Sequence, residues 1–233
     1  MRLTLVRHGE SQLAVHGHGT GLTETGVEQA EISGKWIKEN LDPHEGYCVS
    51  PYARAVLTAV HLGINDAMWK LEPLLIERSW GHSNESIQDR RNSLLEDAEP
   101  YGNDVYSSAP PAGESESMAA MRFLKLYDRL SSKFSTLLVS HAEFMWIARA
   151  YIEQQVPVSY NDKASENGWV TSKDDRNNPV NEKIEFAQVI SYEINYSLNQ
   201  LSVISVCPWK STVPDEYSMP ILLTNEQLLG RVE

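Results

Sequence analysis

An arginine, a histidine and a glycine stand together at residues 7–9, within the segment LTLVRHGES at 3–11. The apolar residues before them predict a short buried strand, and open α/β sheets bind ligands at the carboxyl ends of such strands. Much of the imidazole of His8 is uncharged near neutral pH, so it is a candidate nucleophile. Arg7 offers a planar, permanently charged group that matches phosphoryl oxygens, and Gly9 permits close approach of the backbone to an anion. This combination predicts a phosphate site that contains a nucleophile.

A second cation follows the next apolar strand. The segment SPYARAVLTA at 50–59 begins where an apolar run stops at Pro51, and its apolar spacing predicts a helix. Arg54 lies in the first turn of that predicted helix. Because the N-terminus of a helix attracts anions, Arg54 is a candidate for a second phosphate contact.

A second histidine has the same local setting as the first. The segment STLLVSHA at 135–142 is an apolar strand that ends at His141, and an apolar helical run follows it. The carboxyl ends of parallel strands align at one edge of a sheet. We therefore expect His8 and His141 to face each other across one pocket.

These segments together resemble the histidine phosphatase superfamily, also called the phosphoglycerate mutase-like family, in its RHG-motif branch. The resemblance covers most of residues 1–150. Its six blocks occur in the family's order: RHGES (7–11), LTETGVEQA (22–30), SPYARAVLTA (50–59), ERSWG (77–81), PAGES (111–115) and SHA (140–142).

The resemblance implies that His8 becomes phosphorylated and that two arginines and the second histidine hold the phosphoryl group. It also implies an acidic proton donor after the third strand, which is Glu77 in this chain; Glu85 is the nearest competing carboxylate. The catalytic residues are therefore expected to be His8, Glu77, His141, Arg7 and Arg54.

The expected reaction has two steps. Neutral His8 attacks phosphorus in line while the arginines and a protonated His141 neutralise the phosphoryl oxygens. Glu77 protonates the leaving alkoxide and then deprotonates the water that attacks the phosphohistidine. Since Glu77 must be neutral first and charged afterwards, burial that raises its pKa favours the reaction, and activity is expected to be best at mildly acidic to neutral pH.

Three departures from the common family pattern affect this interpretation. Many members have an asparagine in the loop after the first motif, whereas this chain has Gln12, Leu13 and Ala14, so one neutral phosphate contact is expected to be missing. Ala142 stands where glycine usually follows the second histidine, and a positive φ there would be unfavourable. The segment between the blocks ERSWG (77–81) and PAGES (111–115) lacks the spacing typical of phosphoglycerate mutases. The residues expected to contact substrate are Arg7, Arg54, His141, Ser11, Ala142, Arg78, Arg90 and Arg91.

Residues 79–113 are rich in Ser, Asn, Gly, Pro and charge, which predicts an insertion that caps the site. Arg78, Arg90 and Arg91 either bind a second anionic group of the substrate or form a solvated cluster. Residues 155–182 are polar and are expected to form a long loop or a second insertion.

The remaining patterns predict a three-layer α/β/α sandwich with a mainly parallel sheet. The expected elements are, in chain order, a strand at 3–6, a helix at 23–40, a strand at 47–51, a helix at 52–65, a strand at 70–76, a helix at 114–132, a strand at 136–140, a helix at 143–154 and a hairpin with strands at 184–194 and 201–207.

The composition is that of one folded unit, because 233 residues with 41% hydrophobic content are enough for one sizeable core. We expect a single domain over 1–233. The net charge of -12 disfavours nucleic acid as a partner. The chain has no apolar stretch long enough for a signal peptide or a membrane span, so a cytoplasmic location is expected and no membrane partner. His16 and His18 lack an accompanying cluster of ligands, and we expect no metal and no other cofactor.

The sequence as a whole predicts a phosphatase that hydrolyses a phosphomonoester, either a small molecule or a phosphoprotein, through a phosphohistidine. Two alternatives remain open: a mutase that retains the phosphoryl group, and a noncatalytic module that binds a phosphorylated ligand. The substrate and the oligomeric state do not follow from the sequence.

Overall fold

Short apolar runs form the central strands of one seven-stranded sheet, with the order β3-β2-β4-β1-β6-β7-β5. The computed structural model describes residues 1–12, 21–65, 67–81, 109–130, 135–155, 158–160, 184–195 and 200–206. The strands are β1 (Arg2–Arg7), β2 (Gly46–Val49), β3 (Trp69–Leu71), β4 (Ser135–Ser140), β5 (Val158–Tyr160), β6 (Val189–Asn195) and β7 (Gln200–Val206).

The sheet is mixed and mainly parallel, as the sequence predicts. Strands β1 and β4 pair in parallel from Arg2↔Ser135 to Arg7↔Ser140, and β2 pairs in parallel with both β4 and β3. Strand β6 runs antiparallel to β1 and to β7 and so forms the predicted hairpin, while β5 pairs in parallel with β7.

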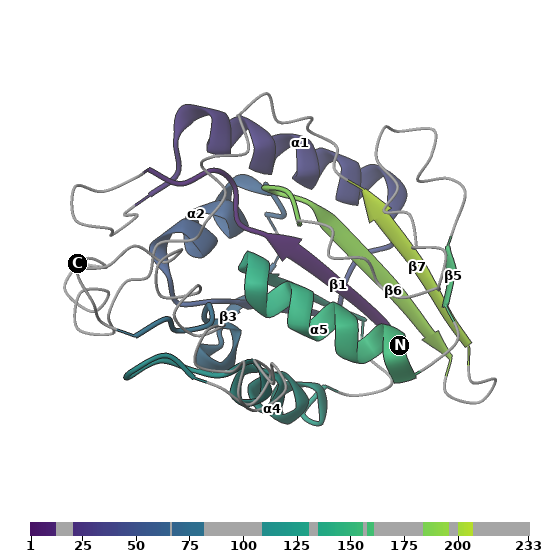
Figure 1. Ribbon diagram of the computed structural model, residues 1–233. Coiled ribbons are helices and arrows are strands. Elements are labelled where there is room, and N and C mark those ends of the chain that lie inside the picture. Colours follow the sequence, from purple (N-terminus) through teal and green to yellow (C-terminus); the bar gives the residue numbers. More distant parts are fainter. Residues whose placement is uncertain are drawn as a thin grey trace.

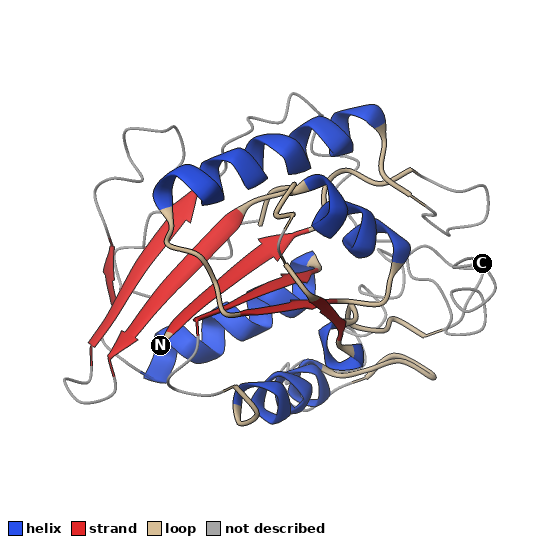
Figure 2. Ribbon diagram, turned by 180° about the vertical axis from the view of Figure 1, so that it is seen from behind, coloured by secondary structure: helices blue, strands red, loops and turns tan. Residues whose placement is uncertain are grey.

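Helices cover both faces of the sheet (Figures 1 and 2). The helices are α1 (Glu24–Asn40), α2 (Ala53–His61), α4 (Glu116–Tyr127) and α5 (Ala142–Gln155). Side chains of a strand alternate between faces: Leu5 and Leu138 pack in a core with α4 and α5, whereas Val6 and Val139 pack in a core with α1 and α2. The two cores hold the central strands between two layers of helices.

Four expected elements differ from the structure by more than two residues at an end. The helix expected at 114–132 ends at Tyr127. The strand expected at 70–76 ends at Leu71, because Pro73 begins a 3₁₀ turn, η1 (Pro73–Leu75), in which the N–H of Leu74 donates to the side chain of Glu72. The helix expected at 52–65 ends at His61, followed by Gly63 with a φ of 62°. The first hairpin strand starts at Val189 rather than 184, after a loop in which Ala187 has a φ of 53°.

The two expected insertions lie mainly outside the described residues. Only 79–81 and 109–113 of the first are described, and strand β5 is the described part of the second beyond the end of α5. Within the part of the chain that is described, no helix has the length and apolar character needed to cross a membrane.

Candidate active site

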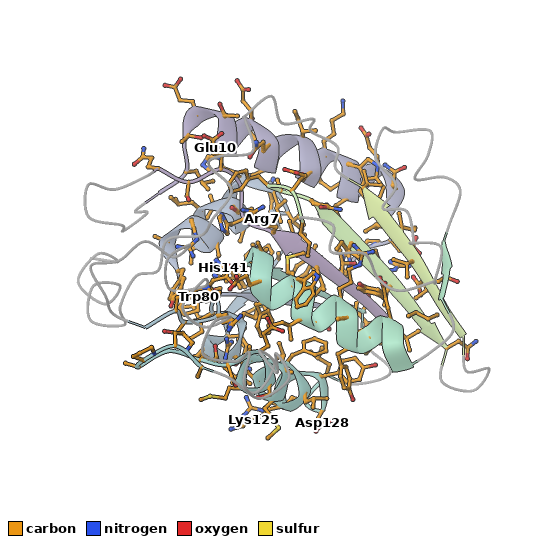
Figure 3. The ribbon with its side chains drawn as sticks, in the orientation of Figure 1. Arg7, Glu10, Trp80, Lys125, Asp128 and His141 are labelled. Carbon is orange, nitrogen blue, oxygen red and sulfur yellow. The ribbon has the colours of Figure 1, made fainter. Side chains whose placement is uncertain are left out.

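Three parallel strands end at the same edge of the sheet, and each is followed at once by a buried polar residue. His8 follows β1, Ser50 follows β2 and His141 follows β4. Backbone hydrogen bonds align these positions, since His8 N–H donates to the carbonyl of Ser140 and Ser50 N–H donates to that of Val139. The predicted meeting of His8 and His141 is confirmed, because their ring centroids lie 5.1 Å apart. Figure 3 shows His141 at the start of α5 and Arg7 at the end of β1.

The hydrogen bonds of His8 define which nitrogen is available for reaction. Nδ1 lies 2.7 Å from the carbonyl oxygen of Gly9, which can only accept, so Nδ1 carries the proton. Nε2 then has a free lone pair and accepts from Nε of Arg54 at 3.1 Å. Burial, followed by the charges of Arg54 and Arg7, holds the pKa of His8 well below its usual value. The ring is therefore neutral, as a nucleophile must be.

The two arginines are both buried beside the histidines. Arg7 donates from Nη1 to the carbonyl of Ile184, and its guanidinium lies 3.9 Å from the centre of the Phe186 ring. Arg54 lies 5.1 Å from the centre of the Tyr52 ring. Each exposes 1% of its surface, so two permanent positive charges stand in a region from which water is largely excluded. Such a region favours an anion with several oxygens.

His141 is fully buried and has one ring nitrogen without a partner. Nε2 lies 2.8 Å from the hydroxyl of Ser50, while Nδ1 has no hydrogen-bond partner among the described residues. A buried polar atom without a partner costs about 1–3 kcal/mol, which a ligand with a matching polar group would recover. Burial and the charge of Arg54 lower the pKa of His141 well below its usual value. Both effects act against the protonated form of His141 that is expected from the sequence.

Glu77 lies at the N-terminus of α5. Its Oε1 accepts hydrogen bonds from the N–H groups of Arg78 and Phe144, both at 3.0 Å, and its side chain is fully buried. Burial raises the pKa of Glu77, while Arg54 and the N–H of Phe144 act in the opposite direction. The charges of Arg54 and Arg7 both lower the pKa of Glu77, so they favour its carboxylate form.

The loop that carries His8 is held by close backbone contacts. Gly9 N–H donates to the hydroxyl of Thr58 at 3.0 Å, and that hydroxyl donates to the carbonyl of Arg54 at 2.7 Å. A Cβ atom on Gly9 would lie 2.3 Å from the carbonyl oxygen of Gly26. Gly9 is therefore required for the contact between this loop and α1, a role that differs from the expected approach to an anion.

Arg78 is placed differently from the other arginines. It is 3% exposed, donates to the carbonyl of Glu114 at 2.9 Å, and pairs with Glu116 at 3.3 Å. Its guanidinium also lies 4.3 Å from the centre of the Trp80 ring. These contacts favour a role in joining the segment after Glu77 to α4. Arg90, Arg91 and Glu85 lie outside the described residues.

The other expected contact residues are on the backbone path around the site. Ser11 forms a bridge with Leu22, and Gln12, which stands in the loop where many members have asparagine, is exposed. Ala142 begins α5, and its φ is not positive, so the unfavourable backbone conformation considered for this position does not occur. Its methyl group is therefore compatible with the turn after His141.

Sequence reasoning missed four residues that contact the site. Ser50 and Tyr52 lie inside the SPYAR block, and Tyr52 packs edge-on against His141 with ring centroids 5.1 Å apart. Phe186 contacts Arg7 and His8, and the backbone N–H of Glu143 donates to Oε2 of Glu77 at 3.5 Å. The position of Ser50 directly after a strand was a usable signal, whereas no local pattern identifies Phe186.

A metal centre has no support in the described part of the chain. No three His, Cys, Asp or Glu side chains there are grouped so that they would hold a metal ion. His16 and His18 lie outside the described residues.

Comparison with known proteins identifies the family of the chain. Residues 3–173 match the family profile of the histidine phosphatase superfamily (branch 1). Fructose-2,6-bisphosphatase TIGAR B of Danio rerio is 31% identical over 177 residues, which is 71% of this chain and 65% of that protein, so the chain spans about two thirds of this relative. An acid phosphatase of Mycobacterium tuberculosis is 32% identical over 165 residues, 66% of this chain and 75% of the relative.

Two solved structures illustrate the similarity of fold. A mycobacterial glucosyl-3-phosphoglycerate phosphatase in complex with inorganic phosphate superimposes with a TM-score of 0.63 at 18% identity, over 90% of this chain and 99% of that one. The alpha-ribazole phosphatase of Shigella flexneri gives a TM-score of 0.60 at 23% identity, over 88% and 96% of the two chains.

Proposed function

Because the chain belongs to the histidine phosphatase superfamily (branch 1), we propose that it is a phosphoric monoester hydrolase that works through a phosphohistidine on His8. The observation that carries the proposal is the state of His8. Its Nδ1–H donates a hydrogen bond to the Gly9 carbonyl, its Nε2 accepts one from Arg54, and its pKa is lowered. A binding module needs the positive charges but has no use for a neutral nucleophile among them.

In the first step, Nε2 of His8 forms a bond to phosphorus as the ester P–O bond breaks. Arg54, which already lies 3.1 Å from Nε2, is placed to hold a phosphoryl oxygen next to the attacking atom. Arg7 supplies a second charge, and Nδ1 of His141 supplies a neutral hydrogen bond. Most of the rate enhancement then comes from positioning and from stabilising the charge on the phosphoryl oxygens.

Glu77 is the proposed acid and base. Burial raises its pKa, which favours the protonated form that donates its proton to the leaving alkoxide. The resulting carboxylate takes a proton from water, the water oxygen attacks phosphorus, and the P–N bond breaks to release inorganic phosphate. Glu77 and His8 are thereby restored to their starting states.

The direct test is release of phosphate from p-nitrophenyl phosphate in excess chelator, from about pH 4.5 to 8, by the wild type and by His8→Ala. We expect turnover that His8→Ala abolishes. His61→Ala is the matched control, because His61 ends α2 and pairs with Glu31 on α1. Turnover that survives in His8→Ala would exclude this mechanism. Absence of turnover in every variant would favour the selective mutase or the binding module.

The proposed substrate is a small-molecule phosphomonoester. The names of the fructose-2,6-bisphosphatase and of the alpha-ribazole phosphatase indicate substrates of this kind for those proteins. The proposed contacts to its phosphoryl group come from Arg7, Arg54 and His141. We do not include Arg78 among them, because its guanidinium contacts Glu114, Glu116 and Trp80.

A further inference from the structure

The hydroxyl group of Ser50 stands between a backbone donor and a catalytic candidate. Ser50 is fully buried at the end of β2, and its Oγ lies 3.4 Å from the N–H of Tyr52 and 2.8 Å from Nε2 of His141. These are its only two hydrogen-bond partners in the described part of the chain. The N–H of Tyr52 can only donate, so it uses a lone pair of Oγ.

The hydroxyl proton of Ser50 therefore has one available acceptor, which is Nε2 of His141. If Nε2 carried a proton instead, it would donate to Oγ and the buried Ser50 proton would be left without an acceptor among the described residues. A buried polar hydrogen without a partner is costly. The geometry thus favours a ring with an unprotonated Nε2 and with its proton on Nδ1.

The charges around His141 act in the same direction. Arg54, Arg7 and Arg122 lower its pKa, as does the neighbouring His8, and they add to the effect of burial. The imidazolium form is disfavoured, so one proton must occupy one of the two nitrogens. Nδ1 is the buried nitrogen without a partner among the described residues, which makes it the nitrogen left for a ligand.

We propose that Ser50 is a positioning residue that holds His141 in its Nδ1–H tautomer, so that a neutral His141 donates a hydrogen bond from Nδ1 to the phosphoryl group. The part of this proposal that concerns the phosphoryl group rests on the proposed phosphatase function, whereas the tautomer is a property of the free protein. His141 acts as a fixed neutral donor and needs no charge of its own, because Arg7 and Arg54 already supply the positive charge.

The first test is ¹⁵N NMR of the ring nitrogens in histidine-labelled protein near pH 7, with His141→Gln used to assign the signals. We expect a protonated Nδ1 and an unprotonated Nε2 in the wild type, and a shift toward the Nε2–H tautomer in Ser50→Ala. An Nε2–H tautomer in the wild type would overturn the proposal, as would an unchanged tautomer in Ser50→Ala. The wild-type spectrum decides the point even where Ser50→Ala fails to fold, and it requires no activity.

The second test uses the pH profile for p-nitrophenyl phosphate. Loss of one positioning hydrogen bond is expected to lower kcat/KM of Ser50→Ala about tenfold at neutral pH, with Ser50→Thr restoring most of it. The deficit should shrink toward acid pH, because an imidazolium carries protons on both nitrogens and no longer needs Ser50. A deficit that stays constant with pH would instead indicate a purely structural role.

Ser191→Ala is the matched control. Ser191 is also a buried serine, and its hydroxyl forms a hydrogen bond of 2.9 Å with the hydroxyl of Thr4. Thr4 lies on β1, four residues before His8. Its removal should leave the His141 tautomer unchanged. If the NMR result holds while no variant shows turnover, the tautomer is established and the proposed phosphatase function fails separately.

Discussion

Gly9→Ala is expected to disable the site through a single methyl group. The new Cβ would lie 2.3 Å from the carbonyl oxygen of Gly26, whereas real Cβ atoms essentially never approach closer than 3.0 Å. The two backbones must therefore separate by at least 3.0 − 2.3 = 0.7 Å. No side-chain rotation relieves this contact, because both partners are backbone atoms. Strand β1 is held by β4 and β6 on both sides, so the displacement falls on the loop of His8.

Overpacking of this kind costs about 1–3 kcal/mol of stability. A misplacement of close to 1 Å in a reacting group lowers its rate by about a hundredfold. The assays are kcat/KM for p-nitrophenyl phosphate and urea unfolding at the same pH. Gly21→Ala is the matched control, since its nearest contact is Cδ1 of Leu57 at an ordinary 3.5 Å. If Gly9→Ala matches Gly21→Ala in both assays, the reasoning from backbone contact is refuted.

Four further variants test the electrostatics. Glu77→Gln should lower kcat/KM for an alkyl phosphate by at least about a hundredfold, because the alkoxide needs a proton to leave. Phosphorylation of the protein by p-nitrophenyl phosphate should change little, because nitrophenolate leaves without a proton. Equal losses for both substrates would contradict the role of Glu77 as an acid. Because the pKa of Glu77 is raised, wild-type activity on the alkyl ester should fall as pH rises through that value. Arg54→Met removes a charge that lowers the pKa of Glu77, so the alkaline fall in activity should move to higher pH. Arg54→Lys keeps the charge, so it should leave that fall in place while lowering kcat/KM about a hundredfold. An unchanged pH profile in Arg54→Met would contradict the influence of Arg54 on the pKa of Glu77. The pKa of His44 is lowered from 6.5 to about 4 by burial and by Arg2, so its contribution to stability is present above pH 6.5 and is lost as pH falls toward 4, by about 3 kcal/mol. In urea unfolding over that range, His44→Gln should show a shallower loss than the wild type, and parallel curves would contradict the assignment.

The central strands and the histidine pair were predictable because the signals are local. Strands β1 and β4 are apolar runs that stop at a polar residue, and their predicted bounds differ from the observed ones by one residue at an end. The parallel alignment of their carboxyl ends then brings His8 and His141 together. Glu77 was identified from its position in the order of the family's sequence blocks. In the structure its carboxyl group accepts a hydrogen bond from the N–H of Phe144 in the first turn of α5.

Other features depend on contacts between distant segments and have no local pattern. Phe186 contacts Arg7, although the two residues lie near opposite ends of the described chain. The positive φ of Ala187 turns the loop of Phe186 before β6 begins. Arg78 has the charge of a substrate contact, but its partners are Glu114, just before α4, and Glu116, the first residue of α4. Gly9 indicates close backbone approach correctly, yet only the fold identifies α1 as the partner.

The most direct test of the central claim is to trap the phosphoryl group on the protein. Glu77→Gln mixed with p-nitrophenyl phosphate should form the phosphohistidine but hydrolyse it slowly, because the base for water is missing. Mass spectrometry of the digested protein should then locate an acid-labile phosphoryl group on His8, at up to about one per chain. The same label should be absent from Glu77→Gln combined with His8→Ala. Nitrophenol release without a phosphoryl group on His8, or with one on another residue, would contradict the account.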